Sequence, residues 1–179
     1  MRHVFPCGSP ALDFVGTLEA RHTPLPIERI ATTGLLDAWF VESGLLDRAP
    51  GSAEADLRAA VGLREAIYAL VRACLTSRDL PAGAVTAVNR QAAGEPVTLA
   101  LGPDGPSRCG TARHALTDLA REAVELVSGS EAELLRECGH PDCTQIYLDR
   151  SRGRRREWCA MRTCGNRVKA AALRARRRR

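Results

Sequence analysis

Residues 138–169 read CGHPDCTQIYLDRSRGRRREWCAMRTCGNRVK and contain four of the seven cysteines of the chain. Four residues separate Cys138 from Cys143, four separate Cys159 from Cys164, and fifteen lie between the two pairs. Two loops that each supply a pair of thiolates can close around a tetrahedral metal ion. The spacing therefore predicts one structural Zn²⁺ with these four cysteines as ligands and no open position for a catalytic water.

The segment around these cysteines has few apolar side chains, so packing alone would hardly fold it. Zinc binding can supply the missing stability, about 10 to 16 kcal/mol in zinc-finger peptides. An iron–sulfur cluster is the alternative metal group, since it also takes four thiolates. Between the cysteine pairs the sequence predicts a strand, a basic turn and a second strand, at 144–148, 150–154 and 155–158.

Positive charge is concentrated at the end of the chain. Residues 150–179 hold 13 of the 26 Lys and Arg and one acid, Glu157, which gives +12, whereas the rest of the chain has a net charge of −7. Such segregation indicates that the end meets a polyanion, nucleic acid before an anionic membrane. The candidate contacts with nucleic acid are Arg150, Arg152, Arg154, Arg155, Arg156, Asn166, Arg167, Lys169 and Arg174.

The residues after the last cysteine predict a helix built on the metal site. Gly165 and Asn166 read as a turn and N-cap, and the helix would run from Arg167 onward. Its basic stripe would consist of Arg167, Arg174 and Arg178. Its apolar side would face the cysteine-containing segment and consist of Val168, Ala171, Ala172 and Ala175. Neutralising about six to eight phosphates of duplex DNA would give a log-log salt slope of roughly −5 to −7.

The fold class predicted is α+β: a mostly helical N-terminal domain with a small sheet, then a small zinc module with a β-hairpin and a helix. Helical periodicity and caps predict helices from Thr33 to Glu42, from Ser52 through Leu75, after Pro81, from Thr111 to Gly129, and over 131–137. Residues 9–18 read as a strand or short helix, and 97–101 as a strand. The turn formers at 128–130 divide the chain into domains 1–130 and 134–179.

Several classes of protein are not expected. No segment approaches the ~18 to 20 consecutive apolar residues of a transmembrane helix, and Pro6, Pro10 and Asp13 interrupt any signal-peptide core. We therefore expect a cytoplasmic chain with reduced thiols and no membrane partner. No histidine or carboxylate has a spacing that indicates a catalytic constellation, so an enzyme is not expected.

The C-terminal motifs resemble a known family. Cys138–Cys143, Tyr147–Arg152, Arg155–Met161 and Cys164–Lys169 closely resemble the CGNR zinc finger of proposed bacterial transcription regulators. The resemblance covers about residues 134–176 and implies that the four motif cysteines bind the zinc. Glu157 stands where members often have arginine, which would weaken one phosphate contact.

The body resembles the ABATE domain of bacterial stress-response proteins. The resemblance rests on Leu12–Thr17 and on Trp39 before Gly44–Leu46, with Gly16 where the family usually has asparagine. It implies a ligand-sensing or assembly domain that takes a small-molecule effector. A homodimer is one possible assembly, because many bacterial regulators read paired half-sites.

Together these features predict a stress-responsive transcription regulator whose zinc module docks on double-stranded DNA. One alternative is an RNA-binding or ribosome-associated zinc protein, which zinc and arginines fit equally well. A third is a small-molecule-binding protein or enzyme in the N-terminal domain.

Overall fold

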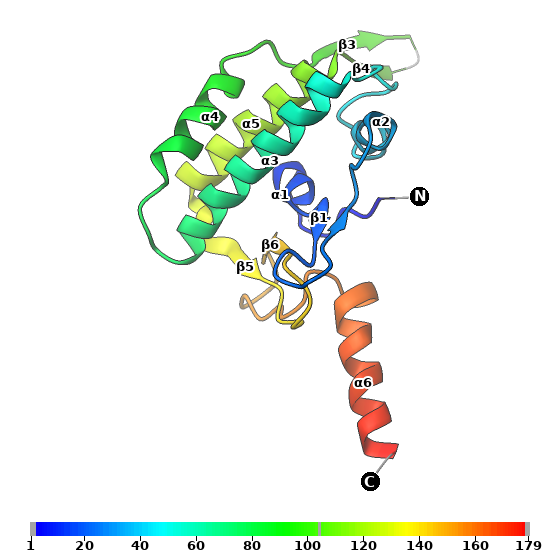
Figure 1. Ribbon diagram of the computed structural model, residues 1–179, viewed down its shortest axis with the longest axis vertical. Coiled ribbons are helices and arrows are strands. Elements are labelled where there is room, and N and C mark those ends of the chain that lie inside the picture. The colour runs from blue at the N-terminus through cyan, green and yellow to red at the C-terminus, as the bar shows by residue number, and fades with distance from the viewer. Residues whose placement is uncertain (1–2, 104, 178–179) are drawn as a thin grey trace.

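The computed structural model describes residues 3–103 and 105–177, except the side chains of residues 172, 175 and 177 (Figure 1). About half of the chain is helical, and the described strands form small antiparallel pairs, β1–β2, β3–β4 and β5–β6. The predicted α+β class is therefore confirmed. Among these residues, no helix is both long and apolar enough to cross a bilayer.

The elements follow one another along the chain in a fixed order. The helices described are α1 (Pro10–Val15), α2 (Thr33–Glu42), α3 (Glu54–Leu75), α4 (Ala82–Ala92), α5 (Ala112–Ser128) and α6 (Asn166–Arg177). The strands are β1 (Leu18–Glu19), β2 (Ile27–Glu28), β3 (Thr98–Gly102), β4 (Gly105–Cys109), β5 (Leu135–Glu137) and β6 (Ile146–Leu148). A 3₁₀ helix, η1 (Ser130–Leu134), precedes β5, and a π-helical turn, η2 (Met161–Gly165), precedes α6.

Helices α3, α4 and α5 lie side by side and, with α1 and α2, form the helical body (Figure 1). Each of the long helices α3 and α5 buries one apolar face, and Ile67 and Leu116 are almost completely enclosed. Trp39 of α2 anchors the other side of this core, with the rings of Phe14 and Phe40 at centroid distances of 5.0 and 5.9 Å. Leucine, alanine and three aromatic rings thus supply the core that the periodicity predicted.

Two helix caps differ from the prediction, which placed them at Thr33 and Ser52. Helix α2 is capped by Thr32, whose Oγ1 accepts from the N–H of Leu35 at 3.3 Å. Ser52 does not cap α3, because its hydroxyl and its N–H both donate to Asp37 of α2. Helix α3 begins two residues later, where the Asp56 carboxylate accepts from the N–H of Ala53 at 2.9 Å.

An ion pair between a buried arginine and a half-buried glutamate ties the β1–β2 ribbon to the helical body. Arg64 of α3 is 2% exposed and donates to both carboxylate oxygens of Glu28 in β2, at 2.7 and 2.8 Å. The same guanidinium donates to Thr17 Oγ1 at 3.1 Å. Because a buried arginine is tolerated only when it is paired, these bonds fix the ribbon against α3.

The zinc-finger segment packs at the opposite end of the body from the β3–β4 hairpin (Figure 1). Strand β6 pairs with β5 in the register Leu135↔Leu148 and Glu137↔Ile146. Residues 155–158 form no strand, so that prediction is wrong. The helix predicted over 131–137 is confirmed only as far as Leu134, as the 3₁₀ helix η1, because 135–137 form β5. The other edge of β6 is taken by the N-terminal segment, since Leu148 N–H donates to the carbonyl of Cys7 at 2.9 Å.

Candidate metal centre

The four cysteines predicted to bind metal converge in the structure. Their sulfur atoms all lie within 4.8 Å of one another. Cys159 Sγ is 3.8 Å from Cys143 Sγ and 3.7 Å from Cys164 Sγ. A tetrahedral zinc with Zn–S bonds of ~2.3 Å requires S···S separations of about 3.8 Å, whereas a disulfide requires about 2.0 Å. The sulfur positions thus fit one zinc ion and no disulfide.

Local backbone structure places each cysteine pair. Cys138 follows β5, and its N–H donates to the carbonyl of Gln145 at 3.0 Å, which closes the loop around Cys143. Within that loop a tight turn lets Cys143 N–H donate to the carbonyl of His140 at 2.9 Å. In the second pair, Cys159 precedes η2 and Cys164 lies within it, where the chain turns before α6 begins at Asn166. The prediction of an N-cap at Asn166 is corrected accordingly, because this residue is already helical.

Two glycines allow both cysteine loops to pack closely against the ring of Trp158. A Cβ on Gly139 would lie 3.3 Å from the Trp158 ring, and a Cβ on Gly165 would lie 3.2 Å from it. Each glycine directly follows a cysteine, so the indole packs beside both halves of the metal site. Trp158 therefore belongs to the core of the finger.

The thiols also affect one another electrostatically. Hydrogen bonds from Cys143, and to a smaller extent from Cys159, lower the pKa of the Cys138 thiol. Their proximity to Cys138 raises the pKa of Cys143 and of Cys159. Without a cation, therefore, the proximity of Cys138, Cys143 and Cys159 opposes the ionisation of all three together. A divalent ion removes this restriction because it stabilises all four ionised ligands together.

Asp149 organises the basic turn that follows β6. Its carboxylate accepts from the Ser151 hydroxyl at 2.5 Å and from the N–H groups of Ser151 and Arg156, each at 3.0 Å. These bonds lower the pKa of Asp149, the Ser151 hydroxyl most of all. They also explain why residues 155–158 do not extend as a strand, since the carboxylate draws the backbone back at Arg156.

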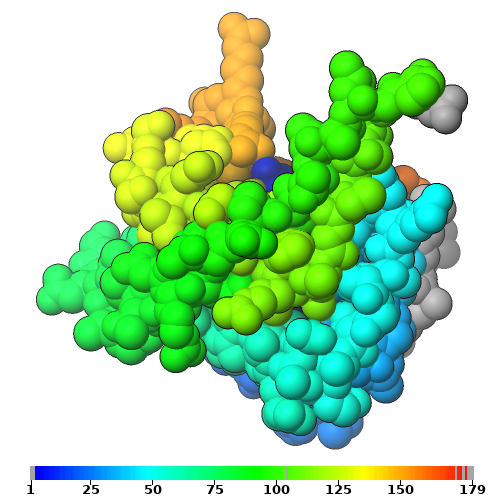
Figure 2. Space-filling view, turned by 90° about the horizontal axis from the view of Figure 1, so that it is seen from above, coloured from blue at the N-terminus to red at the C-terminus, as the bar shows by residue number. Residues whose placement is uncertain are grey.

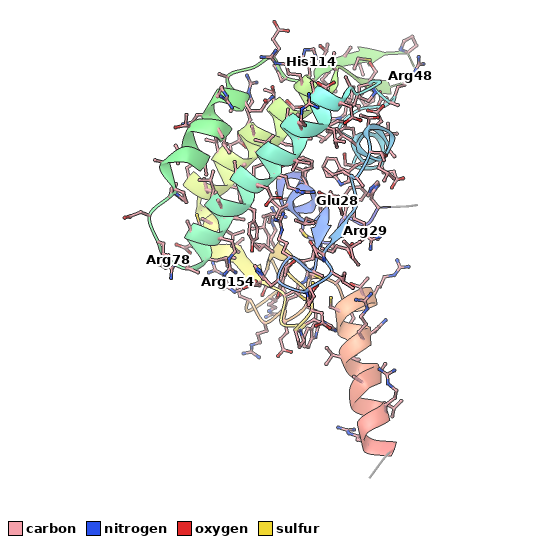
Figure 3. The ribbon with its side chains drawn as sticks, viewed as in Figure 1. Glu28, Arg29, Arg48, Arg78, His114 and Arg154 are labelled. Atoms are coloured by element: carbon pink, nitrogen blue, oxygen red, sulfur yellow. The ribbon has the colours of Figure 1, made fainter. Side chains whose placement is uncertain are left out.

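The predicted nucleic-acid contacts lie in three different settings. Arg156 is inside the finger: it stacks 4.4 Å over the Tyr147 ring and donates to the carbonyls of Trp158 and Pro6. Arg150 and Arg154, at either end of the turn, pair with Glu131 and Glu133 of η1. Figure 3 shows Arg154 on the side of the finger near β5. The remaining members are also exposed, like Arg150 and Arg154, but form no ion pair with a described residue: Arg152, Arg155, Asn166, Arg167, Lys169 and Arg174.

Sequence reasoning missed the acids of η1. Glu131 accepts from Arg150 through both carboxylate oxygens, at 2.7 and 2.9 Å, and these bonds lower the pKa of Glu131. Glu133 lies 3.7 Å from Arg154. The alternation of acids at 131, 133 and 137 beside a basic finger was the available signal, but the segment was interpreted as a helix.

The finger closes a small cavity against the body. The cavity measures about 170 Å³ and is lined by Asp13, Thr17 and Trp39 of the body and by Gln145 of the finger. A Cβ on Gly16 would lie 2.2 Å from the Gln145 amide oxygen, so the Gln145 side chain would have to move if residue 16 were not glycine. Gln145 Nε2 then donates to the carbonyl of Gly16 at 2.9 Å. Burial raises the pKa of Asp13 to about 6.

These features define a class of protein: a helical body joined to a four-cysteine zinc finger. The family model named ABATE, described as "Putative stress-induced transcription regulator", matches residues 8–130, and the model for the CGNR zinc finger matches residues 135–177. The chain therefore belongs to the ABATE family and has a site for one structural zinc ion, as predicted. No curated protein matches the chain.

Proposed function

We propose that this protein is a DNA-binding, stress-responsive transcription regulator of the cytoplasm, without enzymatic activity, whose zinc finger docks on duplex DNA. The observation that carries the proposal is helix α6, which extends away from the rest of the molecule (Figure 1). The helix follows η2 directly, so the zinc site would fix its first turn. Thiols spaced for a metal rather than a disulfide support a reducing compartment.

Helix α6 has little packing of its own. Asn166, Arg167, Lys169 and Arg174 are exposed, and Val168 is half-buried. The apolar side predicted to face the finger is wrong at Ala171, which is exposed; the side chains of Ala172 and Ala175, and Arg178, lie outside the described residues. An isolated helix of 12 residues is marginal in water, and this one contains no acid. A polyanion that contacts the basic residues would stabilise it.

The basic turn supplies a second contact surface. Arg152 and Arg155 are exposed and make no bond to any described residue of the chain, so both can reach phosphates. Arg162 of η2 is also exposed. With the basic residues of α6, this surface can neutralise about six to eight phosphates, which predicts a log-log salt slope of roughly −5 to −7.

The test is selection of binding sites from a random duplex pool by the zinc-loaded full chain at physiological salt. A consensus sequence that disappears in Cys159→Ser and persists in Cys109→Ser supports the proposal; Cys109 is the matched control because it is exposed and lies outside the finger. Binding to structured RNA that exceeds duplex binding at matched salt would instead favour the RNA-binding alternative.

The cavity between the body and the finger is our candidate site for an effector. Its wall includes residues of both parts, so a ligand there would contact the element that we propose docks on DNA. A thermal-shift screen of small polar metabolites would find compounds that stabilise the wild type and Asp79→Asn, an exposed control, but not Asp13→Asn. Equal stabilisation of Asp13→Asn would place the ligand elsewhere.

A further inference from the structure

The β3–β4 hairpin leaves apolar side chains in solvent. It stands out from the helical body as an arm (Figure 2), and Leu99 and Leu101 of β3 are 63% and 87% exposed. The two leucines are two residues apart, so they share one face of the hairpin. Strand β3, Thr98–Gly102, contains no charged residue. A two-stranded hairpin with an exposed apolar face is marginal in water, which indicates that this face is covered.

The outer edge of β4 is closed. Arg108 N–H donates to the Asp47 carboxylate at 2.7 Å, and the Arg108 carbonyl accepts from Asp47 N–H at 3.0 Å. The backbone of Arg108 therefore points away from β3. Two residues earlier, on the same edge, stands Pro106, which has no N–H to donate. No further strand can add to the hairpin on this side.

The outer edge of β3 is open. Leu99 and Leu101 face Arg108 and Pro106 in the register of the hairpin. In an antiparallel pair, two residues that face each other either exchange both backbone hydrogen bonds or exchange none. Because the backbone groups of Arg108 and Pro106 point away from β3, the N–H and C=O groups of both leucines point away from β4. None of these four groups has a partner among the described residues. This edge is a template for one more antiparallel strand.

We propose that a second copy of this chain fills that edge, with the two β3 strands antiparallel about a twofold axis at Ala100. In this register Leu99 of each copy exchanges both backbone hydrogen bonds with Leu101 of the other, so all four open groups of each strand are satisfied. Ala100 meets its counterpart in a non-bonded pair, where the Cα atoms approach to about 4.5 Å and a small residue fits.

The edge is self-complementary in side chains as well. The four leucines gather on one face of the resulting β4–β3–β3–β4 sheet, and no charge opposes the approach of identical strands. A twofold contact uses the same patch on both subunits, which this edge allows. The pairing does not depend on DNA binding, since the hairpin lies at the far end of the body from the finger (Figure 1).

Sedimentation equilibrium over a range of protein concentrations tests the pairing. We expect a dimer, and Leu99→Lys with Leu101→Lys should raise its dissociation constant at least 100-fold. Leu80→Lys is the matched control, because Leu80 is exposed on the α3–α4 connection, and it should leave the constant unchanged. A monomer at all concentrations, or a dimer that persists in the double variant, would overturn the proposal.

A cysteine at the axis tests the register. In a Cys109→Ser background, Ala100→Cys should form an intermolecular disulfide under mild oxidation, because the paired Cα atoms meet the distance that a disulfide requires. Thr98→Cys should not form one, since the two copies of residue 98 would be about 14 Å apart along the strands. Cross-linking of Thr98→Cys and not of Ala100→Cys would contradict this register.

Discussion

The helical body and the zinc finger are stabilised in different ways. The body encloses large apolar side chains such as Phe14, Trp39 and Leu116, so its stability comes from apolar burial. Apart from its cysteines, the described part of the finger buries few apolar side chains, Leu135 and the run Ile146–Leu148, and otherwise depends on backbone and carboxylate bonds. Each part should therefore lose its structure under a different treatment: the finger when a chelator removes zinc, and the body when a substitution opens a cavity in its core.

Removal of zinc should have the largest effect. Metal binding supplies about 10 to 16 kcal/mol in comparable fingers, so a strong chelator or Cys159→Ser should unfold residues 138–165 and reduce duplex affinity at least 100-fold. The helices of the body should remain, and circular dichroism should retain most of its helical signal. Zinc content measured alongside the spectrum checks the assignment. Complete loss of helix on chelation would show that the two parts fold as one unit and break the comparison.

A cavity in the body should have the converse effect. Leu116→Ala removes a side chain that is 1% exposed, and such truncations cost about 2 to 5 kcal/mol. Denaturant unfolding should show that loss, while the zinc content of the purified protein stays at one ion per chain. An exposed leucine, Leu25→Ala, is the control and should cost little. Release of zinc from Leu116→Ala under native conditions would contradict the separation.

The features that could be predicted from the sequence are those that depend on residues close together in the chain. Equal cysteine spacing identified the metal cluster, and helical periodicity located α3 and α5. It could not show that Arg156 is used inside the finger, because its partners at Tyr147 and Pro6 are distant along the chain or come from the opposite terminus. The wrong strand at 155–158 has a similar cause, since the local sequence cannot reveal that the Asp149 carboxylate bonds to the backbone N–H of Arg156 and bends the chain there.

The junction between the two parts also contains a pH-sensitive group. Burial raises the pKa of Asp13 to about 6, against ~3.9 in an unfolded chain. Between these values the folded protein binds more protons, so the free energy of unfolding should fall as pH rises from about 4 to 6, by up to about 2 to 3 kcal/mol.

Asp13→Asn should remove this part of the pH dependence, because an amide oxygen can still accept from the N–H of Cys7. Unfolding titrations at pH 4, 5, 6 and 7 measure it. Burial also raises the pKa of Glu122, which contributes a slope of the same sign, so Glu122→Gln should remove a separate share. An unchanged slope in Asp13→Asn would contradict a buried, partly protonated carboxyl at this position.

The smallest effect tests the contact between the acidic η1 and the basic turn. Glu131 holds Arg150 in a two-bond ion pair at the surface, and such pairs contribute about 0.2 to 1 kcal/mol. If phosphates compete for the same guanidinium, Glu131→Gln should raise duplex affinity about 2- to 5-fold at low salt. The gain should fade as salt rises, because surface pairs and phosphate contacts are both screened.

Glu137→Gln is the matched control, since it removes the same charge nearby but frees Arg72 of α3 rather than an arginine of the turn. Equal gains in both variants would mean that duplex DNA responds only to net charge. A gain confined to Glu131→Gln would mean that the body restrains the turn directly. The acidic body would then set the affinity of the finger through one named contact, and the two parts, though stabilised separately, would be coupled in function.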